Sequence, residues 1–204
     1  WVRRALPGAG GPKSIRGNLG VTLAHIRTWQ AAAASSACTP GGHREPYVLV
    51  LEEDEQGVDA RFAEAVRRIL RRASRDRHPP DWINLNPLRP RGIFVEQVGG
   101  DEDQPVELLR EVKSPGEQTG RRFNLWTSAY LLRCRGARAL AAAVGRIRYH
   151  GVLWNGADPQ LDTALSDLFA RPDNRLRQWA VSPSQAFSYH SERVSARASM
   201  NGSP

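Results

Sequence analysis

The chain has 204 residues, of which 40% are hydrophobic and 25% are charged, and these values are ordinary for a globular protein. This length suits one sizeable domain, and no stretch reaches the roughly 20 consecutive apolar residues that cross a bilayer. The chain opens with Trp1 rather than methionine, so the sequence leaves the cellular compartment open.

The formal net charge of +8 and the pI near 10.4 invite comparison with nucleic-acid-binding proteins. The basic residues, however, are spread from Arg3 to Arg197, and Lys13 and Lys113 are the only lysines. No RNA-binding or zinc-finger signature accompanies them. We therefore do not expect a nucleic-acid partner, and we rank that function behind the alternatives below.

Residues 18–34 have helical spacing, with Asn18 as a suitable N-cap. The residues expected near its buried face are Leu19, Leu23, Ile26 and Ala33, flanked by Val21 and Trp29. His25 lies in this helix beside the apolar stripe. It is either a hydrogen-bonded structural residue or a catalytic one.

The stretch Tyr47 to Glu55, YVLVLEEDE, joins five apolar or aromatic residues to four acids. The unbroken apolar run predicts a strand buried on both faces, as in a parallel sheet. The acids follow where the strand leaves the sheet, and open α/β folds bind ligands at that edge. Carboxylates are hard ligands that suit Mg²⁺ or Mn²⁺, which could in turn hold a phosphorylated substrate. The alternative is a solvated acidic turn.

Further elements alternate along the chain. Asp59 would cap a helix to about Arg75, with Phe62, Val66, Ile69 and Ala73 facing inward. The remaining expected elements are strands at 81–86, 93–98 and 125–132, a loop at 99–120 and a helix at 135–144. This alternation predicts one domain, an α/β sandwich around a mostly parallel sheet.

The two cysteines, Cys38 and Cys134, have no metal-ligand spacing. Sequence does not decide whether they pair, because pairing depends on their distance in the fold. We expect two unpaired thiols.

Several stretches resemble glycosyltransferase family 25, whose members include lipooligosaccharide and procollagen galactosyltransferases. GNLGVTLAHIRTW (17–29) resembles the family's Gly-x-x-Gly-x-x-Leu-Ser-His-x-x-x-Trp helix, and YVLVLEEDE resembles its strand ending in Leu-Glu-Asp-Asp. DWINLN (81–86) is similar to the following Asp-Trp-Asp-x-Ile-x-Leu strand. TSAYLLRCRGARAL (127–140) and PQLDTALSDLFA (159–170) are similar to two later motifs, in the same order.

This resemblance implies a GT-A-type nucleotide-sugar transferase fold over residues 17–181, between a flexible segment at 1–16 and a Ser/Arg-rich tail at 182–204. Family members begin with a strand and an arginine-containing turn. Only about sixteen residues precede the Gly17 helix, so we expect this first strand to be lacking.

The resemblance also implies an activity: transfer of galactose or glucose from a UDP-sugar to a hydroxyl of a glycan, lipooligosaccharide or protein. Glu52 and Asp54 would hold Mn²⁺ or Mg²⁺, with Glu53 between them at the cofactor. His25 and Asp162 would be catalytic, with Asp162 binding or deprotonating the acceptor. The compartment would be the cytoplasm for a bacterial-type enzyme and the secretory lumen for a procollagen-type enzyme. The alternative is a catalytically inactive or fragmentary binding domain of the same fold.

Overall fold

In the computed structural model, the described strands form one six-stranded sheet in the order β1-β5-β2-β6-β4-β3. The structure describes residues 12–38, 45–52, 61–87, 90, 92–111, 127–150, 161, 165, 168, 169 and 175–183. For residues 12–19 and 144–150 it describes the helical backbone but not the side chains. The strands are β1 (Tyr47–Leu51), β2 (Trp82–Asn84), β3 (Ile93–Gly100), β4 (Pro105–Arg110), β5 (Ala129–Arg133) and β6 (Gln178–Ser182). The helices are α1 (Pro12–Ala34), the 3₁₀ turn η2 (Ser36–Cys38), α2 (Phe62–Arg75) and α3 (Cys134–His150).

The prediction of a mostly parallel sheet is wrong. Among the described strands, only β2 and β6 pair in parallel, whereas β1–β5, β5–β2, β6–β4 and β4–β3 are antiparallel pairs. Two features produce this difference. The strand expected at 93–98 forms a hairpin with β4, which lies inside the stretch expected to be a loop, and β5 enters the sheet between β1 and β2 in the opposite direction. The architecture is therefore a mixed α/β fold with a mostly antiparallel sheet.

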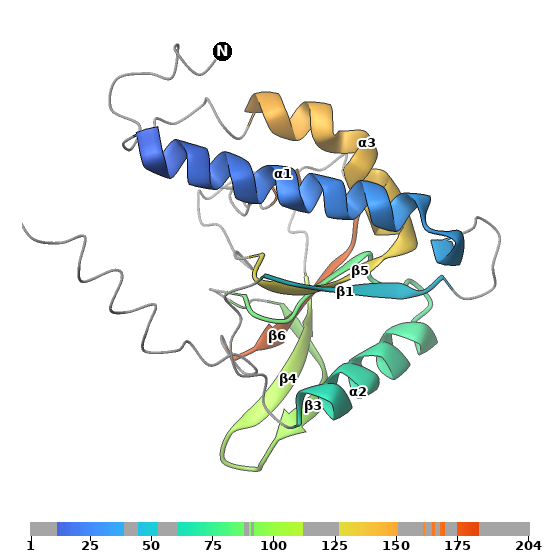
Figure 1. The fold of residues 1–204 in the computed structure, drawn as a ribbon. Coiled ribbons are helices and arrows are strands. Elements are labelled where there is room, and N and C mark those ends of the chain that lie inside the picture. Colours follow the sequence, from blue (N-terminus) through green and yellow to red (C-terminus); the bar gives the residue numbers. More distant parts are fainter. Residues whose placement is uncertain are drawn as a thin grey trace, which may run out of the picture.

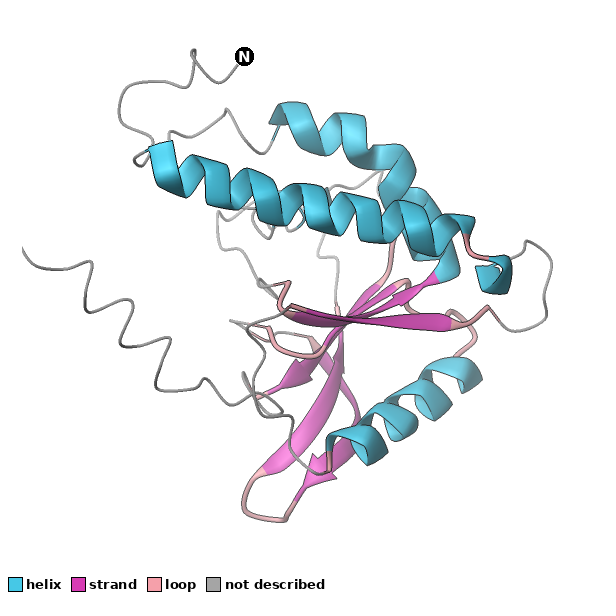
Figure 2. Ribbon diagram, viewed as in Figure 1, coloured by secondary structure: helices cyan, strands magenta, loops and turns pink. Residues whose placement is uncertain are grey.

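Helices cover both faces of this sheet, with α1 and α3 side by side on one face and α2 on the other (Figure 1 and Figure 2). Because strand side chains alternate between faces, each strand contributes to two cores. Trp82, Tyr130 and Leu132 pack beneath α1 and α3 with Trp29 and Leu140. Ile83, Leu85 and Leu131 pack beneath α2 with Ile69 and Ala73.

The strand β1 lies at an edge of the sheet, so the expectation that it is buried on both faces is wrong. Leu49 and Leu51 are 40% and 42% exposed, whereas Val48 and Val50 pack against the core beneath α1. The side chains of β1 alternate between the core and solvent, and a uniformly apolar sequence does not show this alternation. β1 thus has one face toward the α1 layer and one partly exposed face.

The helix predictions are confirmed with changed boundaries. α1 begins at Pro12, so Asn18 lies within the helix and does not cap it. Its buried face is His25, Trp29 and Ala32, whereas Leu23 is 50% exposed. In α2, Ala65, Ile69 and Ala73 are buried, as the helical spacing requires. None of the described helices is long and apolar enough to cross a lipid bilayer.

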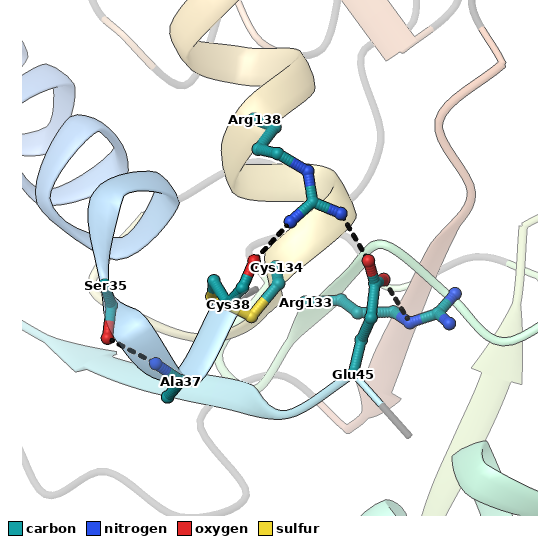
Figure 3. The surroundings of a disulfide bond; sticks show 7 residues. All are labelled: Ser35, Ala37, Cys38, Glu45, Arg133, Cys134 and Arg138. Carbon is teal, nitrogen blue, oxygen red and sulfur yellow. Dashed lines mark hydrogen bonds and ion pairs between the residues drawn. A yellow bond between two sulfur atoms is a disulfide. The ribbon is translucent and has the colours of Figure 1, made fainter. Parts of the chain in front are cut away.

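Cys38 and Cys134 form a disulfide bond, so the expectation of unpaired thiols is wrong (Figure 3). Their Cα atoms lie 5.3 Å apart, within the range that a disulfide spans. Arg138 of α3 adds a second link, since its Nη1 donates to the carbonyl of Cys38 at 2.8 Å. The same guanidinium pairs with Glu45, which also pairs with Arg133. The end of α1 is thereby fastened to the start of α3.

The first turn of α3 lies against the backbone of Asp81, and Gly136 permits this approach. A Cβ at Gly136 would lie 2.4 Å from the carbonyl oxygen of Asp81. That oxygen accepts a hydrogen bond from the Arg133 amide at 3.0 Å, and the Asp81 amide donates to Arg177 at 2.9 Å, so the backbone there is held on both sides.

Gly136→Ala should therefore lower the free energy of unfolding by about 1–3 kcal/mol, the usual cost of overpacking. Urea unfolding measures this change. Gly20→Ala is the matched control, because no atom lies within 4 Å of a Cβ built there in α1. This control should raise stability by about 0.5–1 kcal/mol through helix propensity. An equal effect of both substitutions would contradict the close approach at Gly136.

Candidate functional site

Polar residues lie together at one end of the strands, where β1 and β2 end and β5 begins. β5 is antiparallel to both neighbours, so these three chain segments meet at the same edge. Glu52 directly follows β1, and its amide donates to the carbonyl of Ser128 at 2.7 Å. Asn86 follows β2, and its Nδ2 donates to the Ser128 hydroxyl at 3.0 Å. Ser128 therefore links the chain segments that follow β1 and β2.

The carboxylate of Glu52 points toward α1. Its Oε1 lies 2.9 Å from Nε2 of His25 and accepts a hydrogen bond from the Thr127 hydroxyl at 2.9 Å. His25 comes from the buried face of α1, and Thr127 precedes β5. Three segments that are far apart in sequence thus converge on one carboxylate oxygen. The hydrogen bonds of Glu52 to described side chains all involve Oε1, and none involves the other carboxylate oxygen, Oε2.

The second ring nitrogen of His25 is also engaged. Nδ1 lies 2.8 Å from the hydroxyl of Tyr130, which accepts a hydrogen bond from the indole Nε1 of Trp29 at 3.0 Å. The Tyr130 ring stacks on Trp82 with 3.7 Å between ring centroids. Trp29, Tyr130 and Trp82 are all fully buried, so the polar atoms of this group are held inside the core beneath α1.

His25 and Glu52 form part of the wall of an open cavity of about 440 Å³ between α1 and the end of β1. The other lining residues are Gly20, Val21, Ala24, Thr28, Val50 and Leu51. The side chain of Glu52 is 27% exposed, whereas that of His25 is 5% exposed. The cavity therefore presents a partly exposed carboxylate, backed by a buried imidazole, between apolar walls.

The hydrogen bond from His25 lowers the pKa of the Glu52 carboxyl below its ordinary value. Partial burial acts in the opposite direction, and the hydrogen bond from Thr127 adds to the lowering. Glu52 is therefore an anion at neutral pH. Burial raises the pKa of the Tyr130 hydroxyl, so this group keeps its proton and remains a donor.

Of the five residues expected at the site, the structure brings His25 and Glu52 into direct contact at the cavity. Glu53, Asp54 and Asp162 lie outside the described residues, so their roles stay predictions. Within the described ranges, no group of three or more His, Cys, Asp or Glu side chains is placed to hold a metal ion. A cation at this edge would have Glu52 as its described ligand, and an ionised, partly exposed carboxylate is a suitable hard donor.

Three partners at the site do not follow from the sequence reasoning: Trp29, Thr127 and the hydroxyl of Tyr130. The Tyr130 ring packs on Trp82, and its hydroxyl also contacts His25. A usable signal is the presence of Trp29 one helical turn after His25, because a buried indole N–H requires an acceptor.

Compared with known families and with curated proteins, the chain matches no family and no curated protein. The resemblance to glycosyltransferase family 25 therefore rests on the motifs in the sequence.

Proposed function

We propose that this chain transfers a hexose, galactose or glucose, from a UDP-sugar to an acceptor hydroxyl with the help of a divalent metal ion. The observation that supports this proposal is the ionised Glu52, which follows β1 and lines the cavity beside His25. These two residues belong to two separate motifs of the family resemblance. Their contact in space is what a shared site would require.

In this proposal, Glu52 and Asp54 would hold Mn²⁺ or Mg²⁺ after the end of β1, with Glu53 between them at the cofactor. The ion, when bound, would neutralise negative charge on the departing diphosphate. His25 holds the Glu52 carboxylate in place through its Nε2. The cavity wall that contains the carboxylate also includes the apolar side chains of Val21, Val50 and Leu51. Asp162 would accept the proton of the acceptor hydroxyl.

A second candidate function is a catalytically inactive binding domain of the same fold. It is favoured by the two hydrogen bonds that Glu52 Oε1 already accepts from His25 and Thr127, because these bonds satisfy that oxygen without a metal ion. Such a domain would bind a glycan or a protein partner and would consume no UDP-sugar.

Turnover distinguishes these two functions. The full chain is incubated with UDP-galactose or UDP-glucose and a panel of glycan and peptide acceptors, with Mn²⁺ or with EDTA, and the UDP released is measured. We expect release that requires Mn²⁺ and that Asp54→Asn abolishes. UDP release by the Asp54→Asn variant at the wild-type rate would contradict the metal role of Asp54. No UDP release by the wild type from either donor would favour the inactive binding domain.

A further inference from the structure

The hydrogen bonds around Tyr130 can have only one direction. The indole Nε1–H of Trp29 is a donor and never an acceptor, so the Tyr130 oxygen must accept from it. The hydroxyl proton of Tyr130 then points elsewhere. Among the described residues, the acceptor within reach is Nδ1 of His25, at 2.8 Å.

The reverse assignment leaves a buried donor without a partner. If Nδ1 of His25 carried a hydrogen, the Tyr130 oxygen would accept two hydrogen bonds and its own proton would lack an acceptor in the described part of the chain. Tyr130 is fully buried and His25 is almost so, which excludes bulk water as a substitute. An unsatisfied buried donor costs about 1–3 kcal/mol. With Nδ1 as the acceptor, the single hydrogen of the neutral ring lies on Nε2, which faces Glu52 Oε1 at 2.9 Å.

We propose that Trp29 and Tyr130 are positioning residues, which hold Nδ1 of His25 as an acceptor and thereby keep its Nε2–H directed at the Glu52 carboxylate in the cavity wall. The chain of donors runs from Trp29 through Tyr130 and His25 to Glu52, and we call these four residues the relay. The Thr127 hydroxyl donates to the same oxygen of Glu52 and prevents the carboxylate from rotating.

The relay also specifies how Glu52 would meet a cation, and this part rests on the proposed function. Oε1 accepts two hydrogen bonds, so Oε2 is the oxygen with no donor among the described residues. Glu52 would therefore bind a divalent ion through one oxygen, and His25 would not coordinate the ion because both of its nitrogens are engaged. Partners of this kind commonly contribute about 10–100-fold to metal affinity.

Tyr130→Phe tests the relay, because it removes the hydroxyl and keeps the ring that stacks on Trp82. Tyr47→Phe is a matched control: it removes a hydroxyl that donates to the Pro80 carbonyl at 2.7 Å, outside the relay. Two quantities are measured on the full chain. Nitrogen NMR of ¹⁵N-labelled histidine, with His25→Gln to assign the signal, reports which ring nitrogen carries the hydrogen. Calorimetry with Mn²⁺ alone reports the cation affinity.

We expect the Nε2–H tautomer in the wild type and in Tyr47→Phe. In Tyr130→Phe the ionised Glu52 still requires a hydrogen on Nε2, but Nδ1 has lost its donor. We therefore expect the Nδ1 signal to shift toward that of a nitrogen without a hydrogen bond, together with about 10-fold weaker Mn²⁺ binding. If Tyr130→Phe does not fold, Trp29→Phe replaces it; Tyr130 can still donate to Nδ1, so we expect the Nε2–H tautomer to persist with a smaller loss of Mn²⁺ affinity than in Tyr130→Phe. A wild-type His25 with its hydrogen on Nδ1 would overturn the relay, as would a Tyr130→Phe variant that matches the wild type in both measurements. A wild-type chain with the Nε2–H tautomer and no Mn²⁺ binding would support the relay and contradict the proposed function.

Discussion

Replacing Cys38 and Cys134 together by alanine should lower the free energy of unfolding by about 5 kcal/mol. The bond joins residues 96 positions apart, and closing a loop of this length removes about that much chain entropy from the unfolded state. Many domains have a total stability of about 5–15 kcal/mol, so this loss removes a large share. The end of α1 would then be held to α3 by Arg138 and by packing alone.

Urea unfolding of the oxidised wild type, the reduced wild type and the double alanine variant separates the cross-link from the side chains. The reduced wild type keeps both cysteine side chains, so it should lose nearly as much stability as the double variant. A loss below about 1 kcal/mol in the reduced protein, well under the usual range for a native disulfide, would show that the bond does not stabilise the fold in this way.

Glu52→Gln should weaken Mn²⁺ binding by more than about 100-fold, because loss of a ligand exceeds the 10–100-fold effect of outer-shell partners. The substitution removes the negative charge and preserves the shape of the side chain. The amide oxygen of Gln can still accept hydrogen bonds from His25 and Thr127, so the variant should fold with nearly unchanged thermal stability. Calorimetry with Mn²⁺ and a thermal unfolding curve check these two results.

Glu64→Gln is the control for this substitution. Glu64 is an exposed carboxylate on α2 that pairs with Arg67, Arg68 and Arg71, away from the cavity. The Glu64→Gln variant should bind Mn²⁺ with the affinity of the wild type. Equal Mn²⁺ affinity in Glu52→Gln and Glu64→Gln would place the cation elsewhere and remove Glu52 from the site.

The local elements of this fold could be predicted from the sequence, because their signals are short-range. The helix at 62–75 is predicted by the spacing of its own apolar residues, and the strands at 47–51 and 82–84 are predicted by their own apolar runs. The direction of the strands could not be predicted in this way. β5 carries the same kind of apolar run whether it enters the sheet parallel or antiparallel, and β4 has acidic, turn-forming residues before it that suggest a loop.

The candidate site shows the same division. The acids after β1 and the histidine in α1 could be singled out from their positions in the sequence, and Glu52 and His25 do lie together. The bond between His25 and Tyr130 spans 105 positions and depends on how α1 packs across β5, which no local pattern records. The disulfide could not be predicted for the same reason, since it depends on the distance between the ends of two helices.

Calorimetric titration of the full chain with UDP, in the presence of Mn²⁺ and again in EDTA, tests the central claim most directly. If carboxylates at the end of β1 hold a cation that binds the diphosphate, UDP should bind in Mn²⁺ and this binding should disappear in EDTA. Equal UDP binding in both solutions, or none in either, would contradict a metal-dependent sugar-nucleotide site at Glu52.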